Sequence, residues 1–89
     1  MGRKLTKTDY LKIKKNILKK LYSHQAFSRG HLLYERLQST VPSHLQGSVK
    51  DILDDLIKNG LVLYYGKTKH RDAYQLNIKK LKEIEQIIT

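Results

Sequence analysis

The densest group of residues suited to binding chemistry is a short basic stretch, Lys67-Thr68-Lys69-His70-Arg71. It places three fixed positive charges and one titratable imidazole within five residues. Lysine and arginine side chains neutralise phosphate groups and release the counterions that surround a nucleic acid. We therefore expect this stretch to contact phosphates, with binding that weakens steeply as salt rises. The alternative is a solvated loop whose charges serve only solubility.

Positive charge is also concentrated at the N-terminal end of the chain. The formal net charge is +10, and eight of the 18 lysine and arginine residues lie within residues 1–20, against Asp9 alone. Such a surplus attracts polyanions over long distances. We expect further phosphate contacts from Arg3, Lys4, Lys7 and Arg29. Two alternatives remain: a lysine-rich helix face that is simply hydrated, and a basic amphipathic helix on a membrane surface. The core needs the apolar side of that helix, which disfavours the membrane.

The other reactive residue types form no catalytic or metal-binding pattern. Cysteine is absent, so the chain has no thiol nucleophile and no cysteine-based zinc site. Asp54 and Asp55 are neighbours, and neighbouring carboxylates on a helix do not face each other. There is no glycine-rich phosphate loop and no G-x-S-x-G motif. No metal-ligand spacing occurs among the four histidines: His24, His31, His44 and His70. We therefore expect a protein that is not an enzyme and that needs no cofactor or metal.

Length and patterning predict one small domain. Of the 89 residues, we assign 1–7 to a basic N-terminal arm and 8–89 to the folded domain. The N-terminus lacks the apolar segment of a secretory signal, and the longest apolar run, 61–65, is too short to cross a bilayer. The absence of cysteine fits a reducing compartment. We expect a cytoplasmic protein without membrane contact.

The first element that positions these charges is a helix from Thr8 to Ser23. Apolar residues recur three or four positions apart on one side of it, Lys12, Lys15, Lys19 and Lys20 occupy the other side, and Lys14 falls near the apolar side. Thr6 or Thr8 is the expected N-cap. The lysines are thus predicted to face solvent while the apolar side enters the core.

A second helix is predicted to follow Phe27. Ser28 is a suitable N-cap, Phe27 is placed to pack on Leu32 as a hydrophobic staple, and His31 falls on the surface of the helix. The helix should end near Ser39, because proline at position 42 disfavours helical geometry at the preceding residue.

A third helix is predicted from Ser43 to Asn59-Gly60. Ser43 and Gln46 have the spacing of a capping box, a continuous apolar face follows, and Asn-Gly is a typical helix stop. The face away from the core carries a mixture of lysines and aspartates.

After Gly60 the pattern changes to that of a β-hairpin and a last helix. Residues 61–65 are rich in β-branched and aromatic types, and residues 73–78 alternate between small or polar and apolar types. A loop of about six polar residues should join the two strands. Tyr64 and Tyr65 must then point to opposite faces, so that one is exposed for base stacking. Asn77 is the expected cap of the final helix.

The segment VKDILDDLIKNGLV (49–62), followed by YQLN (74–77), resembles the winged helix-turn-helix superfamily. In that family the third helix ends with this pattern of leucines and a glycine before an apolar strand. The resemblance covers about 50 residues. It implies an α+β fold with a three-helix core, a β-hairpin wing and a C-terminal helix. It also implies a small single-domain DNA-binding protein of the kind found in bacteria and archaea.

The resemblance further implies that the third helix enters the major groove of DNA while residues 67–71 form the wing. By position, the recognition residues are His44, Gln46, Gly47, Ser48, Lys50 and Asp51. Gln reads adenine, Lys reads guanine or phosphate, and Asp accepts from cytosine; backbone N–H groups at the starts of the second and third helices are further phosphate contacts. We expect a duplex-DNA-binding transcriptional regulator or chromatin-associated factor. The acidic third helix keeps two alternatives open: an RNA-binding winged helix of a ribonucleoprotein, and a protein-interaction module in a larger assembly.

Nucleic acid is thus the expected partner, with DNA favoured over RNA. Many DNA-binding proteins of this kind act as two-fold dimers. The last helix carries Ile84, Ile87 and Ile88 on one side, and together with the first helix it is a candidate homodimer surface. The equal alternative is that these isoleucines pack on the core of their own chain.

Overall fold

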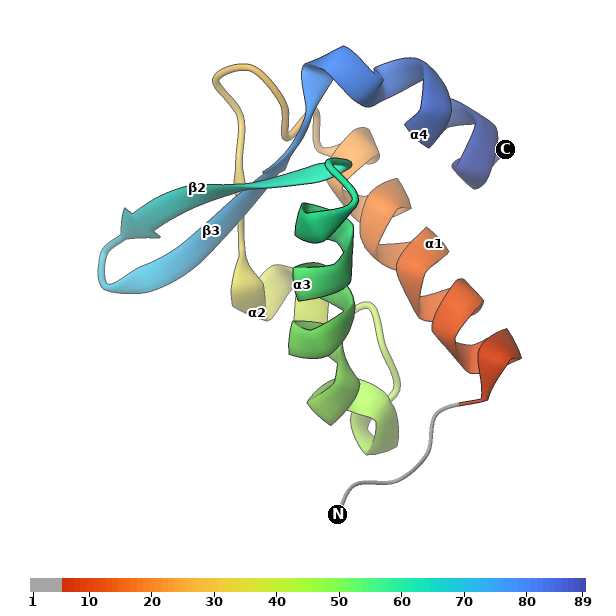
Figure 1. Cartoon of the computed structure of the whole chain (residues 1–89). Helices are drawn as coiled ribbons and strands as arrows, with labels where there is room; N and C mark the ends of the chain where they lie inside the picture. Colours follow the sequence, from red (N-terminus) through yellow and green to blue (C-terminus); the bar gives the residue numbers. More distant parts are fainter. Residues whose placement is uncertain (1–5) are drawn as a thin grey trace.

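The computed structural model describes residues 6–89, which fold as an α+β unit (Figure 1). Two predicted phosphate contacts, Arg3 and Lys4, lie outside the described residues. Within 6–89 there are four α-helices and a three-stranded antiparallel sheet of order β1-β3-β2. The helices are α1 (Lys7–Ser23), α2 (Tyr34–Gln38), α3 (Val49–Lys58) and α4 (Leu81–Ile88), and the strands are β1 (Leu32–Leu33), β2 (Val62–Thr68) and β3 (Arg71–Leu76).

The core lies between the helices and one face of the sheet. Apolar side chains from all four helices and from β2 and β3 form one buried cluster, and burial of each large one contributes roughly 1.5–3 kcal/mol. The largest fully buried side chains are Ile13, Ile17, Leu18, Leu21, Leu37, Ile52, Leu53, Leu56, Leu76 and Ile84. This cluster fixes α1 and α3 side by side and holds the base of the hairpin against them. Among residues 6–89, no helix combines the length and the apolar character needed to cross a membrane.

Helix α1 matches its prediction closely. It begins at Lys7, one residue earlier than expected, and the backbone N–H of Asp9 donates a hydrogen bond of 3.0 Å to Oγ1 of Thr6. Thr6 is therefore the N-cap. The expected apolar side is buried at Ile13, Ile17, Leu18 and Leu21, but Leu11, which was expected to widen it, is 50% exposed.

The predicted second helix is wrong over its first half. Residues 28–33 form a turn and the short strand β1, which pairs with Ala73 and Tyr74 of β3, and α2 begins only at Tyr34. Ser28 has a φ of +60° and caps no helix. The side-chain Nε2 of Gln75 donates to the carbonyl oxygens of Ser28 and Gly30, both at 3.0 Å. These long-range hydrogen bonds from β3 satisfy the backbone that a local helix would otherwise have used.

Helix α3 is preceded by a 3₁₀ segment, Ser43–Ser48. The predicted capping box is wrong, because the cap residue is Pro42 and Nε2 of Gln46 instead donates 3.1 Å to the carbonyl of Val41. The predicted stop is confirmed. Gly60 has a φ of +81°, and the N–H groups of Gly60 and Leu61 donate back to the carbonyls of Ile57 and Leu56, which is a Schellman motif.

The hairpin is longer and its turn is tighter than predicted. Thr68 pairs with Arg71, so Lys69 and His70 alone make the turn, with φ values of +51° and +68°. Positive φ at both central residues is the backbone of a type I′ turn, which matches the twist of the two strands. A bulge at Tyr65 shifts the register between Tyr64 and Gly66.

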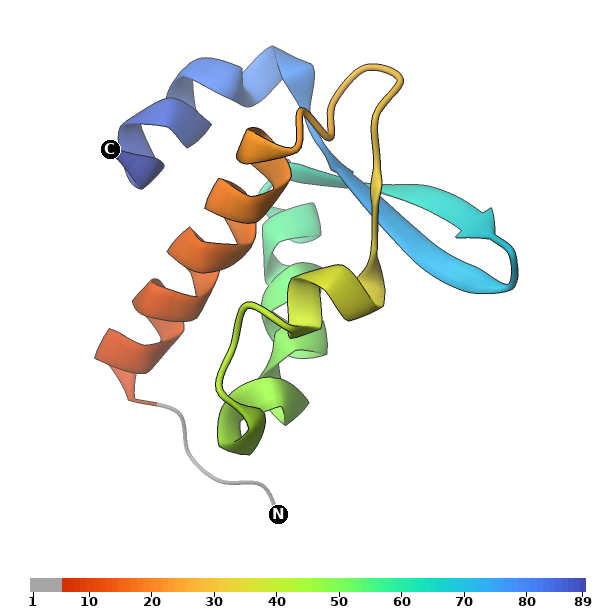
Figure 2. The same cartoon turned by 180° about the vertical axis from the view of Figure 1, so that it is seen from behind.

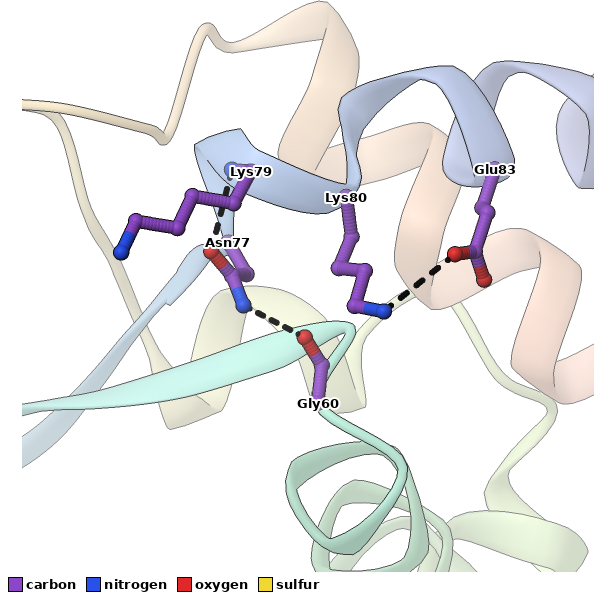
Figure 3. Close-up of polar contacts among 5 residues, drawn as sticks. All are labelled: Gly60, Asn77, Lys79, Lys80 and Glu83. Carbon is purple, nitrogen blue, oxygen red and sulfur yellow. Dashed lines mark hydrogen bonds and ion pairs between the residues drawn. The ribbon is translucent and has the colours of Figure 1, made fainter.

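Asn77 joins the sheet to the last helix (Figure 3). Its Oδ1 accepts from the backbone N–H of Lys79 at 3.1 Å, and its Nδ2 donates 2.7 Å to the carbonyl of Gly60 at the end of α3. The predicted cap is confirmed, although a 3₁₀ turn, Ile78–Lys80, comes before α4. Ile84 of α4 is fully buried, and the Tyr22 hydroxyl of α1 donates 2.6 Å to Glu85. The apolar side of α4 thus packs within its own chain, and a homodimer through α1 and α4 stays a prediction.

Candidate nucleic-acid interface

The two elements expected to contact nucleic acid lie on neighbouring sides of the molecule. The hairpin projects away from the helices, and α3 runs beside its base with the 3₁₀ segment at the far end (Figure 1). Helix α2 lies behind α3 in the view of Figure 1 and packs against β1 and β3, whereas α1 lies at the opposite end from the hairpin tip (Figure 2).

The hairpin tip presents exposed positive charge. Lys67 and Lys69 are exposed, and within residues 6–89 neither has a carboxylate oxygen within 4.0 Å. Arg71 differs, because its Nη1 lies 3.6 Å from a carboxylate oxygen of Glu35 in α2, with both side chains more than half exposed. Exposed ion pairs of this kind contribute about 0–1 kcal/mol. Arg71 is therefore bound weakly to α2 and can exchange Glu35 for a phosphate at little cost.

The start of α3 is less free than the sequence indicated. His44, Gly47, Lys50 and Asp51 are exposed, whereas Ser48 and Gln46 are half-buried, and the Gln46 amide is bonded to the backbone. Nζ of Lys50 lies 3.3 Å from Oδ1 of Asp54. A Cβ on Gly47 would meet nothing within 4 Å, and its φ is not positive. The fold itself therefore does not require glycine there, and the bare backbone is open to close approach.

Between α3 and the hairpin the surface is acidic and aromatic. The rings of Tyr34 and Tyr64 pack on Tyr74 with centroids 6.4 and 5.6 Å away. The pKa of Tyr74 is raised to about 12, chiefly by burial and then by the nearby carboxylates of Asp72 and Asp54. Burial also raises the pKa of Tyr34, with Lys50 opposing and aspartates of α3 adding to the increase. Carboxylates therefore surround the tyrosine cluster, which repels a polyanion wherever Lys50 and Arg71 do not neutralise them.

Two tyrosines of β2 are exposed, not one. The Tyr64 side chain is 49% exposed and that of Tyr65 is 43% exposed. The hydroxyl of Tyr64 donates 2.8 Å to Asp72. Tyr65 stacks on His31 with ring centroids 4.2 Å apart and an interplanar angle of 17°. The prediction that put His31 on a helix surface is wrong, because His31 precedes β1; no local signal identifies a pair that forms only when β1 joins the sheet.

A second basic surface covers α1. Its six lysines, Lys7, Lys12, Lys14, Lys15, Lys19 and Lys20, have no carboxylate partner within 4.0 Å in the described part of the chain. An open hollow of about 400 Å³ lies beside the C-terminal half of this surface. Asn16, Lys19, Lys20 and Ser23 of α1 line it together with Thr40 from the loop after α2. Sequence reasoning located this charge but not the hollow, which depends on how the loop packs.

The other predicted contacts are scattered. Arg29 is exposed in the turn before β1, and no helix begins near it. Lys7 is exposed at the start of α1. Within 6–89, no group of three or more histidines, cysteines or carboxylates is placed to hold a metal ion. Comparison of the chain with protein-family models, with curated proteins and with solved structures finds no match.

Proposed function

We propose that this chain is a winged-helix domain that binds duplex DNA, as a transcriptional regulator or chromatin-associated factor. In this proposal the 3₁₀ segment and the start of α3 approach the major groove, and the hairpin acts as the wing on the phosphate backbone. The single observation that carries it is the pair Lys67 and Lys69, which are exposed and have no carboxylate partner within residues 6–89; Lys69 lies in the two-residue turn of the projecting hairpin and Lys67 lies in β2 just before it.

The order of elements supports this function. Three helices precede a β-hairpin and a further helix follows it, as the resemblance to winged-helix proteins implies. A strand pair closed by a tight turn holds its tip charges in place better than a long loop does, so less side-chain and backbone freedom is lost on binding. Gly47 leaves the backbone open at the point where the groove edge would approach.

Two exposed ion pairs involve acidic residues near the proposed DNA-binding surface. Lys50 is paired with Asp54 and Arg71 with Glu35, all in exposed positions. Because exposed pairs are weak, phosphate can replace the carboxylate at either cation. Asp51 is also exposed, and its carboxylate can accept a hydrogen bond from the amino group of a cytosine. The phosphate contacts then supply most of the affinity, with limited base readout from α3.

The carboxylates around the tyrosine cluster favour one second candidate, a protein-interaction module that docks a basic partner between α3 and the hairpin. The two candidate functions differ in the sign of the charge on the ligand. A domain of the first kind binds a polyanion through its tip lysines, whereas a domain of the second kind binds a polycation and does not need them. An RNA-binding winged helix belongs with the first candidate and differs only in the ligand preferred.

The test is a titration of labelled duplex DNA, structured RNA and single-stranded DNA, followed by fluorescence anisotropy at about 50 and 200 mM salt. Lys67→Ala/Lys69→Ala should weaken duplex binding and lower the slope of log affinity against log salt by about 2, since each phosphate contact contributes about 0.9. The matched control is Lys79→Ala/Lys82→Ala, which removes the same charge from exposed positions near α4. Equal losses in both variants would leave only non-specific attraction by net charge, and tighter binding to RNA than to the duplex would assign the RNA function.

A further inference from the structure

We infer that the lysine surface of α1, with the hollow at Lys19 and Lys20, is a second binding site for the phosphodiester backbone, and that the domain bridges two nucleic-acid segments. The bridging rests on the function proposed above, because the hairpin tip holds the first segment. The hollow itself is defined by Asn16, Lys19, Lys20, Ser23 and Thr40.

The first argument is that the charge on α1 is not balanced within the fold. Asp9 is the only acid in the helix, and none of its lysines has a carboxylate partner within residues 6–89. Lys15 and Lys19 are four positions apart on the same side of the helix, where like charges repel and destabilise it. A chain that needed charge only for solubility would do as well with interspersed signs. A polyanion laid along α1 relieves this repulsion.

The second argument is the chemistry of the hollow. Ser23 donates its hydroxyl proton to the carbonyl of Lys20 and Thr40 donates its proton to the carbonyl of Leu37. These two hydrogen bonds orient the side chains of Ser23 and Thr40 at the edge of the hollow. Lys19 and Lys20 supply ammonium donors and Asn16 supplies an amide, and within residues 6–89 none of the three makes a side-chain hydrogen bond. A phosphodiester offers only acceptor oxygens and one negative charge, which is what such a group of donors is suited to bind.

The third argument is the extent of the surface. Lys12, Lys15 and Lys19 share the side of α1 opposite its buried residues, and from Lys12 to Lys19 the helix rises by about 10 Å at 1.5 Å per residue. This is the length of about three base pairs of duplex at 3.4 Å each. Several lysines can therefore contact one backbone together while Lys19 and Lys20 hold a phosphate in the hollow. A small phosphate metabolite would leave most of this surface unused.

A membrane surface fits α1 less well than nucleic acid does. Ile13, Ile17, Leu18 and Leu21 are buried in the core, so the apolar side of the helix cannot enter a bilayer without unfolding the domain. Insertion of an apolar side is a main source of affinity for interfacial helices. Only the charge term remains, and the duplex has the higher density of charge.

The positions of the two surfaces lead to bridging. Helix α1 lies at the end of the molecule remote from the hairpin tip in both views (Figures 1 and 2). The domain measures 36 × 32 × 21 Å. Duplex DNA is stiff, with a persistence length of about 150 base pairs, so bending one short duplex around the domain to reach both surfaces is costly. Two separate segments reach both surfaces without bending.

The test is a capture assay with two short duplexes, one immobilised on beads and one carrying a fluorophore. Wild-type protein should retain the free duplex on the beads. Lys19→Glu/Lys20→Glu should lower retention by about tenfold or more while changing affinity for a single duplex by less than about threefold. Lys79→Glu/Lys82→Glu is the control with matched charge, and circular dichroism establishes that every variant is folded.

The outcomes separate this proposal from the function proposed above. Equal retention by Lys19→Glu/Lys20→Glu and the control overturns the α1 site. Bridging by a dimer that uses its two hairpin tips would give this same result. Binding of a single duplex that depends on Lys67 and Lys69, with no retention by wild type, supports the winged-helix function and overturns bridging. Single-duplex binding that depends on Lys19 and Lys20 alone keeps the α1 site but removes the hairpin function. Binding to phosphatidylserine vesicles through Lys19 and Lys20, without duplex retention, assigns the hollow to lipid and overturns the proposal.

Discussion

At the scale of single residues, the hairpin turn places two residues with a Cβ in a disfavoured backbone region. Lys69 and His70 both have positive φ, a region that side chains with a Cβ disfavour by roughly 1–2 kcal/mol. Asn-Gly is the pair preferred at these two positions. Lysine and histidine in this turn therefore destabilise the fold, but they place a positive charge and an imidazole at the tip of the hairpin. Such local strain tends to occur at binding sites.

This cost leads to a prediction for the turn. Lys69→Asn/His70→Gly should raise the free energy of unfolding by about 1 kcal/mol, because both replacements suit positive φ. Urea unfolding followed by circular dichroism measures it. Lys67→Asn is the matched control, since it removes a neighbouring charge from an extended strand position and should give no gain. A turn variant no more stable than the wild type would show that the tip is not strained. The same variant should bind duplex DNA more weakly.

A second residue-scale prediction concerns pH. Tyr74 is almost fully buried, and its pKa is raised to about 12 from 10.0. The unfolded state therefore loses this proton first, so stability is unaffected below about pH 10 and falls as pH rises from 10 to 12. The total loss from this group, complete above about pH 12, is on the order of 3 kcal/mol.

The measurement is the urea midpoint between pH 9 and pH 12, compared for wild type and Tyr74→Phe. The phenylalanine variant cannot ionise at this position, so its stability should fall less steeply over that range. Lysine deprotonation affects both proteins alike and cancels in the comparison. Parallel curves for the two proteins would mean that Tyr74 is accessible to solvent in the folded state.

At the scale of elements, the sequence predicted correctly those helix ends that are set by hydrogen bonds between residues close together in the chain. The start of α1 at Thr6, the stop of α3 at Gly60 and the cap of the last helical segment at Asn77 all follow from hydrogen bonds between near neighbours in the chain. The first half of the second helix was predicted wrongly because Gln75, far along the chain, bonds to the backbone of residues 28 and 30.

The candidate site divides in the same way. The location of positive charge in α1 and in residues 67–71 is a property of the sequence alone and was predicted. The ion pair between Arg71 and Glu35 was not predicted, because the two side chains meet only when α2 packs beside the hairpin. The hollow beside Lys19 likewise requires Thr40 from another element. Long-range packing therefore decides which charges stay free for a ligand.

The element-scale prediction tests the connection at Asn77. Asn77→Ala removes both the cap on Lys79 and the hydrogen bond to the Gly60 carbonyl (Figure 3), so the free energy of unfolding should fall by about 1–2 kcal/mol. Asn59→Ala is the control, because Asn59 is exposed and its side chain makes no hydrogen bond within residues 6–89. It should stay within about 0.5 kcal/mol of wild type. Chemical denaturation measures both, and equal effects would mean that solvent replaces the Asn77 contacts.

At the scale of the whole molecule, one charge distribution has opposite effects on folding and on binding. A net charge of +10 on 89 residues repels itself in the compact state. Salt screens this repulsion, since the Debye length falls from about 10 Å at 0.1 M to 3 Å at 1 M. The same salt weakens attraction to a polyanion by reducing the gain from counterion release. A fold built only for stability would not carry so large an imbalance.

The last prediction follows from that opposition. The Tm of the free protein should rise between about 50 and 500 mM NaCl, whereas the additional rise in Tm given by saturating duplex DNA should shrink over the same range. Differential scanning fluorimetry with and without duplex measures both trends. Lys19→Glu/Lys20→Glu lowers the net charge and places acids among the α1 lysines, so its free form should gain less from salt than the wild type does. A Tm of the free protein that falls with salt would mean that attractive ion pairs outweigh repulsion. The lysines of α1 would then be part of the stability of the fold and not a surface kept open for a ligand.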